Sequence, residues 1–128
     1  MTVEEILAEV DMKYPNDVDK AHKWGWITQL EKLIVDECFL THIISDQEKE
    51  RVKRAVETVT FSRDYLPLAQ PPYQDVYIHY LSSKIAQLNV DTDAYENEST
   101  LFNNALLTYK NMFNRTHRSI DKGQRWRF

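Results

Sequence analysis

Glycine, cysteine and long apolar runs are all scarce in this chain of 128 residues. Only two glycines occur, whereas a usage of about 7% would give about nine. The sequence therefore contains neither the phosphate-binding P-loop nor the glycine fingerprint of dinucleotide-binding proteins. The single cysteine, Cys38, excludes an internal disulfide and a zinc site built from several cysteines. The longest apolar run has three residues, as in Leu33–Val35, which is too short to span a bilayer.

The composition that remains is that of one ordinary globular domain. Hydrophobic residues make up 42% of the chain and charged residues 28%, close to the averages for globular proteins. A chain of this length can bury a core without help from metals or disulfides. The opening residues MTVEEILAEV lack the basic region and apolar stretch of a secretory signal. We therefore expect an intracellular, non-membrane protein without a cofactor.

Charge is distributed unevenly along the chain. The net charge is −4, but residues 115–128 contain five basic side chains and one acidic one, which gives +4 and leaves −8 for residues 1–114. The last four residues are Arg-Trp-Arg-Phe. Such asymmetry is typical of an interaction tail, and aromatic side chains beside arginines are common interface anchors. A solvated chain end is the alternative. We predict one helical domain, residues 1–114, and a basic tail, residues 115–128, that we expect to be flexible.

Two helices are predicted in the first third of the chain. Thr2 and Glu5 fit a capping box, and the helix that they begin should end before Tyr14, because a proline follows. A second helix, capped by Asp17 or Asp19, should run to about residue 40. Its predicted apolar stripe comprises Trp26, Ile27, Leu30, Leu33, Ile34 and Glu37/Cys38.

Residues 43–71 change character twice. The run DQEKERVKRAVETV pairs Glu50 with Arg54 and spaces Val52, Val56 and Val59 as one helix face, which predicts a charged surface helix. Residues 58–72 are β-branched, aromatic and rich in proline, which predicts an extended arm or an irregular connection.

The strongest helical periodicity lies in the C-terminal half. Pro72 suits the first turn of a helix, and the residues Asp91–Asp93 separate that helix from the next and can cap it. The two apolar faces comprise Tyr73, Tyr77, Tyr80, Leu81, Ile85 and Leu88, then Tyr95, Phe102, Leu106, Tyr109 and Phe113. We predict an antiparallel helix hairpin with an aromatic seam. The fold class is therefore all-α: a bundle of four to five helices with this hairpin, the extended arm and the basic tail.

Candidate catalytic or metal-binding groups are few. Cys38 and His42 lie four residues apart, but two ligands do not make a zinc site. Asp75 and His79 have the spacing of a dyad in which an acid orients an imidazole, although we favour a local ion pair on the helix surface. We interpret Glu96 and Glu98 as parts of a charged solvent-facing surface.

Two segments resemble a family of bacteriophage proteins. The string PPYQDVYIHYLSSKIAQLN, followed by YENESTLFNNALLTYKNMFNRTH, resembles the C-terminal half of small head-to-tail connector proteins of tailed phages and prophages, especially those of Gram-positive hosts. The openings TVEEILAEVD and WITQLE also look like the family's first helices, whereas residues 43–70 match nothing in it. The residues of the pattern are Pro72, Tyr73, Asp75, Tyr77, Tyr80, Leu81, Tyr95, Phe102, Asn103, Asn114, Arg115, Thr116 and His117.

The resemblance implies a structural protein of the virion neck, made in the bacterial cytoplasm and without enzymatic activity. Such an adaptor assembles as a ring beneath the portal protein, lets double-stranded DNA pass through its channel and contacts neck or tail proteins. Residues 58–72 would make a second contact between subunits. The residues expected to dock on the portal or a neighbour are Arg115, Arg118, Lys122, Arg125, Trp126 and Arg127.

Two other functions stay open from the sequence. The chain can be a small regulatory or nucleic-acid-binding module whose tail grips phosphates, although the acidic body repels a phosphate backbone. It can also be an enzyme that uses Asp75 and His79, which would require a concave pocket around them. The connector is the function that we favour.

Overall fold

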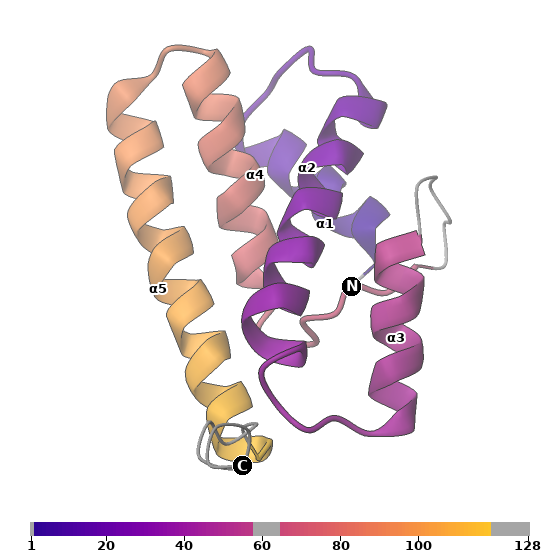
Figure 1. Cartoon of the computed structure of the whole chain (residues 1–128). Coiled ribbons are helices and arrows are strands. Elements are labelled where there is room, and N and C mark those ends of the chain that lie inside the picture. Colours follow the sequence, from indigo (N-terminus) through magenta and orange to yellow (C-terminus); the bar gives the residue numbers. More distant parts are fainter. Residues whose placement is uncertain (1, 58–64, 119–128) are drawn as a thin grey trace.

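The computed structural model describes residues 2–57 and 65–118. Within those residues the chain forms five α-helices, one short π-helix and no strand, in agreement with the all-α prediction (Figure 1). The search of these residues found no helix with both the length and the apolar character needed to cross a membrane. The elements are α1 (Val3–Lys13), α2 (Lys20–Ile34), η1 (Val35–Phe39), α3 (Asp46–Glu57), α4 (Asp75–Leu88) and α5 (Thr92–Thr116).

Side-chain caps begin three of these helices where the sequence predicts them. Thr2 and Glu5 form the reciprocal capping box of α1. Asp19 caps α2 by accepting a hydrogen bond from a backbone N–H of the first turn, and Asp91 does the same for α5. Each cap satisfies a backbone donor that has no partner inside the helix, so these local signals fix where the helices start.

The second helix ends in a way that the sequence did not predict. From Val35 to Phe39 the chain continues as the π-helix η1, in which the N–H of Leu40 bonds to the carbonyl of Val35 at 2.9 Å. Val35, Cys38 and Phe39 are all buried. The helical stretch therefore reaches the predicted end near residue 40, but its last turn is wider than an α-helical turn.

The segment before α4 corrects one prediction. Pro72 does not occupy the first turn of a helix, because α4 begins at Asp75. Pro72 lies instead in a turn in which the N–H of Tyr73 donates to the carbonyl of Gln70 at 2.9 Å. Pro72 leaves no backbone donor unpaired in this turn, because proline has no N–H.

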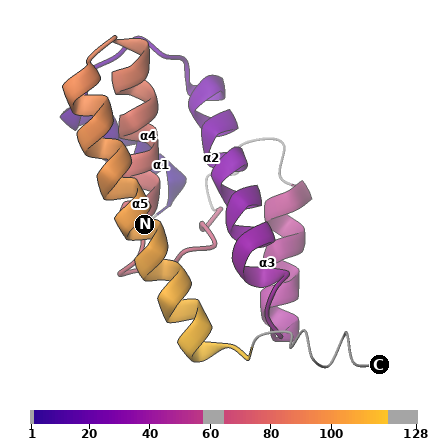
Figure 2. The same ribbon diagram turned by 60° about the vertical axis from the view of Figure 1, so that its left-hand side comes forward.

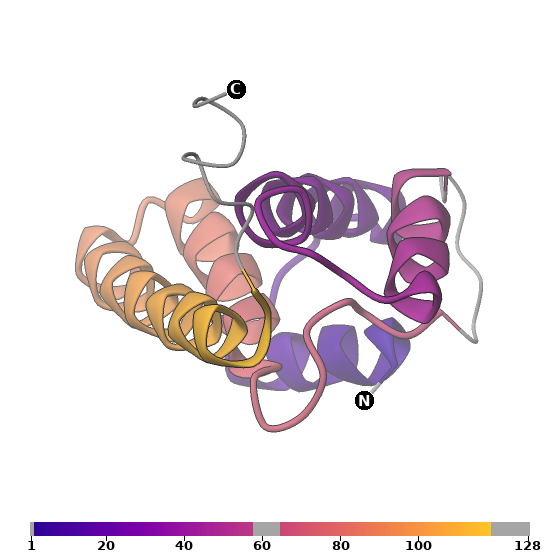
Figure 3. The same cartoon turned by 60° about the horizontal axis from the view of Figure 1, so that its bottom comes forward.

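Residues 65–74 cross the molecule between α1 and α2 (Figure 3). They contain no helix or strand, and Leu68 and Ala69 are 2% and 0% exposed. This part of the predicted subunit contact is therefore core, although Leu66 and Pro72 remain exposed. Residues 58–64, which complete that predicted contact, and Val59 of the predicted helix face lie outside the described residues.

The helices form two pairs. Figure 2 shows α2 beside α3 on one side of the molecule and α4 beside α5 on the other. Tyr80 of α4 packs on Phe102 of α5 with ring centres 5.0 Å apart, and Tyr73 packs on Tyr109 at 5.8 Å. Apolar residues of all six elements contribute to one core, which leaves the outer face of α5 exposed along most of its length.

Candidate functional site

The predicted docking residues begin at the C-terminal end of α5. Arg115 lies in the last turn of α5, and both Arg115 and Arg118 are exposed. The carbonyl of Arg118 accepts a hydrogen bond of 2.7 Å from the N–H of Ile43, so the chain is attached to the body two residues beyond the helix. α5 itself continues past the predicted start of the tail, to Thr116. The other predicted docking residues, Lys122, Arg125, Trp126 and Arg127, lie outside the described residues.

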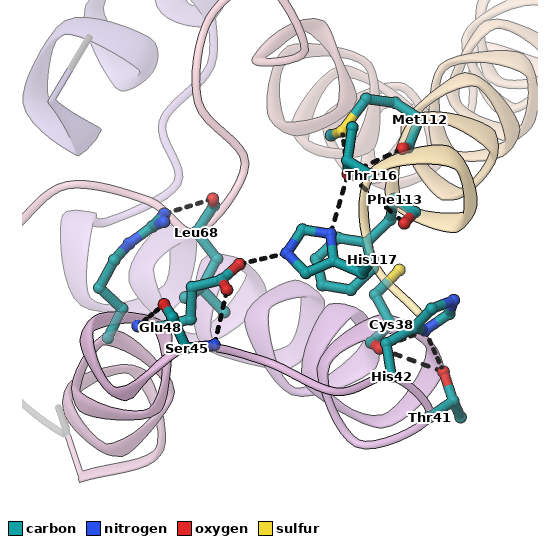
Figure 4. Close-up of polar contacts among 11 residues, drawn as sticks. Cys38, Thr41, His42, Ser45, Glu48, Leu68, Met112, Phe113, Thr116 and His117 are labelled. Carbon is teal, nitrogen blue, oxygen red and sulfur yellow. Dashed lines mark hydrogen bonds and ion pairs between the residues drawn. The ribbon is translucent and has the colours of Figure 1, made fainter. Parts of the chain in front are cut away.

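His117 fastens this end of α5 to α3. Its ring stacks on the ring of Phe113 with centres 3.8 Å apart and planes 6° from parallel. One ring nitrogen, Nδ1, lies 2.8 Å from the hydroxyl of Thr116, and the other, Nε2, lies 2.5 Å from a carboxylate oxygen of Glu48. Figure 4 shows His117 between these two partners. We call the contacts of residues 113–118 with η1, α3 and the segment that joins them the tail root.

Glu48 has two roles in the tail root. Its carboxylate accepts a hydrogen bond of 2.9 Å from the backbone N–H of Ser45, whose hydroxyl accepts one from the N–H of Glu48. These two bonds form a capping box for α3. Burial alone would raise the pKa of Glu48, but the bonds from Ser45 and His117 outweigh burial and lower it. A single carboxylate therefore starts α3 and holds the end of α5.

His42 holds the other side of the same helix end. Its Nε2 lies 2.7 Å from the side-chain oxygen of Asn114, and its Nδ1 lies 2.8 Å from the carbonyl of Cys38. The imidazole also meets the ring of Phe113 edge-on, with centres 5.0 Å apart. The rings of both histidines therefore contact the ring of Phe113 and hold this end of α5 against η1 and α3.

The possible metal pair of Cys38 and His42 does not gain further ligands. No group of three potential metal ligands occurs among the residues that the structure describes. Both nitrogens of His42 have hydrogen-bond partners in the tail root. Burial raises the pKa of the Cys38 thiol to about 11, so this sulfur is protonated at neutral pH and is a poor nucleophile and a poor metal ligand.

Glu31 is the centre of a polar cluster inside the core. This α2 residue is 2% exposed. Its carboxylate accepts hydrogen bonds from the hydroxyls of Tyr65 and Tyr77 and, at 3.0 Å, from the N–H of Leu68. The hydroxyl of Tyr77 accepts in turn from the N–H of Ala69. Burial raises the pKa of Glu31, and the three hydrogen bonds reduce this effect without reversing it. The cluster attaches the irregular segment 65–69 to α2 and α4.

Glu98 forms a second buried cluster and corrects two predictions. Its side chain is 1% exposed, so it is not part of a solvent-facing surface. It accepts hydrogen bonds from Lys13 at 2.7 Å, from Tyr14 at 2.9 Å and from His79 at 2.7 Å. The ion pair predicted between His79 and Asp75 does not form, because His79 pairs with Glu98. Burial would raise the pKa of Glu98, but these three partners together lower it.

Sequence reasoning missed both clusters, although a signal was present. Glu31 lies four residues after Ile27 and three before Ile34, which places it on the buried face of α2. Glu98 lies three residues after Tyr95 and four before Phe102, on the inner face of α5. An acidic residue at such a position is buried only when it has partners.

Comparison of the chain with models of protein families, with curated protein sequences and with solved structures yielded no match. A function can therefore be inferred only from the sequence resemblance and from the geometry of the described residues. In that geometry the clusters around Glu31 and Glu98 join elements of the fold to one another. The tail root differs from them, because it fixes the end of α5, where Arg115 and Arg118 are exposed, to the folded body.

Proposed function

We propose that this chain is a head-to-tail connector of a tailed bacteriophage or prophage, a non-enzymatic adaptor that forms a ring between the portal and the tail. The observation that supports this function most directly is the tail root. Contacts through His42, His117 and Ile43 hold the start of the basic segment against the body. A docking segment needs such an attachment, because a fixed starting point lowers the entropy lost when the segment binds.

The aromatic residues that carry the family resemblance lie in the core or in the contact between α4 and α5, which supports the proposal. Tyr77, Tyr109 and Phe113 are buried, and Tyr80 and Phe102 pack on each other across the helix hairpin. These aromatic side chains build the fold and are not available as a stacking surface for bases. These residues therefore give no support to nucleic-acid binding, which makes it the weaker candidate.

The outer face of α5 suits contact between copies. Over several turns it exposes amides, hydroxyls and the side chains of Leu101 and Leu107 rather than charges. Like charges facing each other across an interface cost energy, and this face avoids them. The acidic balance of residues 1–114 in turn suits a channel through which DNA passes without binding. The uncharged exposed residues of α5 include Asn97, Thr100, Asn103, Asn104, Thr108 and Asn111.

Light scattering after size-exclusion chromatography tests the proposal, first on the protein alone and then on its mixture with the portal protein encoded beside it. We expect a ring-sized species, alone or with the portal. The paired substitution Arg115→Gln and Arg118→Gln should prevent docking on the portal, because it removes two charges where the tail begins. The matched control neutralises two exposed lysines of α3, Lys49 and Lys53, and should dock normally.

Three outcomes would contradict parts of the proposal. A wild-type protein that stays monomeric and ignores the portal would disprove the connector function. Normal docking of the Arg115 and Arg118 variant would remove those two residues from the docking surface. Tight binding to duplex DNA, with a log–log salt slope of about −3 to −5, would favour the nucleic-acid-binding module instead.

A further inference from the structure

The link between α4 and α5 has an unusual residue at its tightest point. Val90 has a φ of 55°, in the left-handed region that glycine and asparagine adopt far more readily than a β-branched residue. Such a backbone costs a β-branched residue about 1–2 kcal/mol. The side chain of Val90 is 84% exposed, so burial within this copy does not offset the cost. Folding of a single copy does not explain a valine here.

A shallow hollow lies beside Val90. Its volume is about 130 Å³. Its apolar wall consists of Ala86, Val90 and the half-exposed ring of Tyr95. Asp91 lines the hollow, and Asp93 is exposed in the first turn of α5. We call Ala86, Val90, Asp91, Asp93 and Tyr95 the hairpin tip. A hollow with an apolar wall and an acidic rim fits an aromatic side chain that has cationic neighbours.

The sequence contains a segment of that kind. Trp126 lies between Arg125 and Arg127, and Phe128 follows. Burial of an aromatic ring supplies most of the binding energy at many interfaces, and flanking opposite charges supply orientation. The segment 125–128 therefore complements the hairpin tip in both respects.

The hairpin tip of the same copy is too far away for Trp126. The tip lies at the N-terminal end of α5 and the tail root at its C-terminal end. α5 has 25 residues, which corresponds to a length of about 37 Å. A fully extended chain from Arg118 to Trp126 spans at most about 29 Å. A contact between Trp126 and the tip must therefore join two copies.

We propose that the segment 125–128 of one copy binds the hairpin tip of a second copy, with an aromatic ring in the hollow and arginines against Asp91 and Asp93. The contact joins different surfaces of the two partners, so it propagates from copy to copy and closes as a ring if the rotation between copies allows. This inference rests on the proposed function, since it names the contact through which a connector ring would form.

Fluorescence anisotropy tests the contact directly. The ligand is a dye-labelled peptide of residues 119–128. The receptor is the full chain with Trp126→Ala and Phe128→Ala, so that its own segment does not compete. We expect saturable binding, weakened at least about tenfold by Val90→Gly in the receptor, because the apolar wall is lost. Urea unfolding should show that Val90→Gly keeps or raises stability, since glycine accepts the positive φ.

A second apolar site near the tail root provides the control. Leu40 and Ile43 are 58% and 54% exposed, and the tail of the same copy can reach them. Replacing both with serine should leave peptide binding unchanged. Loss of binding in that variant, with normal binding in Val90→Gly, would overturn the proposal and place the segment on its own root. Absence of binding up to about 1 mM peptide would overturn it as well.

A mixing experiment tests whether the contact joins different surfaces. A tip-deficient chain with Val90→Gly and Asp93→Lys keeps its tail, and the chain with Trp126→Ala and Phe128→Ala keeps its tip. At concentrations above the measured dissociation constant, light scattering should show each variant as a monomer and their mixture as a one-to-one dimer. A mixture that stays monomeric would overturn the proposal.

The two proposals fail in different ways. A protein that binds the peptide at its tip but ignores the portal would keep this contact and lose the connector function. A protein that forms a complex with the portal but does not bind the peptide would keep the connector function and lose this contact.

Discussion

Two carboxylates, Glu31 and Glu98, are buried almost equally and held in opposite ways. Glu31 accepts hydrogen bonds from neutral donors, namely two tyrosine hydroxyls and a backbone N–H, and the charge of Arg51 is the smallest influence on its pKa. Glu98 has a lysine and a histidine among its partners. Burial is the largest influence on the pKa of both groups; it prevails for Glu31 and raises its pKa, and the partners prevail for Glu98 and lower it.

The difference shows that a buried acid can stabilise a fold in two separate ways. Its hydrogen bonds hold neighbouring segments in position, and its charge attracts cationic side chains. Neutral donors hold Glu31 in place without compensating fully for the loss of water around its charge. The cluster therefore depends on every donor being paired. Glu98 lies where α1, α4 and α5 meet and gains from charge directly. Ionisation of Glu98 therefore stabilises its cluster, whereas ionisation of Glu31 destabilises its cluster, which the geometry of the neutral donors holds together.

Removal of each carboxylate should give the largest effects. Glu31→Ala leaves two hydroxyls and one N–H without an acceptor inside the core, which should lower the free energy of unfolding by about 3–5 kcal/mol. Glu98→Ala should cost less, about 2 kcal/mol, because Lys13 is 46% exposed and can be solvated by water. Urea unfolding followed by circular dichroism measures both values.

The exposed Glu50 of α3 provides the control for these two substitutions. Glu50→Ala should change the free energy of unfolding by less than about 0.5 kcal/mol. Equal losses for Glu31→Ala and Glu98→Ala would show that the partners of the two acids make no difference, and would remove the contrast drawn here.

Replacing a hydrogen-bonding tyrosine by phenylalanine beside each acid should lower the free energy of unfolding by a smaller amount, and by different amounts at the two acids. Tyr77→Phe removes a donor to Glu31 and the acceptor of the N–H of Ala69, so we expect a loss of about 2 kcal/mol. Tyr14→Phe removes one donor to Glu98, which keeps Lys13 and His79 as partners, so we expect less than about 1 kcal/mol. The ranking would be refuted by a Tyr14 variant less stable than the Tyr77 variant in the same unfolding assay.

The pH dependence of stability should separate the two acids by sign, with the smallest changes in free energy. The lowered pKa of Glu98 gives stability that is present above the unfolded value of about 4.3 and is lost as pH falls through the folded value. The raised pKa of Glu31 gives the opposite dependence, since its contribution is complete below the unfolded value and declines as pH rises through the folded value.

Difference curves make that contrast measurable. The stability of the wild type minus that of Glu98→Gln should fall as pH is lowered below about 4.3. The stability of the wild type minus that of Glu31→Gln should rise as pH is lowered through the range above about 4.3. Unfolding in urea at a series of pH values gives both curves, and slopes of the same sign would contradict the assignment.

The parts of the fold that sequence predicted well depend on local signals. Thr2, Asp19 and Asp91 cap helices because each cap bonds within three residues of itself, and such spacing is visible in a sequence. The position of Pro72 was wrong because a proline that suits a helix start suits a turn equally well. The buried crossing of residues 65–69 was missed because it depends on Glu31, which lies more than thirty residues earlier.

The sequence predicted the basic residues of the candidate site but not the contacts that hold them. The sequence marks Arg115 and Arg118 as basic and near the end of the last predicted helix. It does not reveal that His117 bonds to Glu48, because those residues are 69 positions apart. The acid at position 98 could have been flagged from its place among apolar residues, but its partners in α1 and α4 could not, since periodicity identifies a face and not what covers it.

The π-helix η1 lets the chain accommodate one extra residue ahead of the tail root. A turn closed between residues five apart contains one residue more than an α-helical turn, and Asp36 and Glu37 are exposed within it. Deleting either one would let the turn close as an ordinary α-helical turn, so the residues that follow would keep nearly the same orientation about the helix axis. His42 would then still face Phe113. The same deletion inside α2, where no wider turn takes up the change, would rotate every later residue by about 100°.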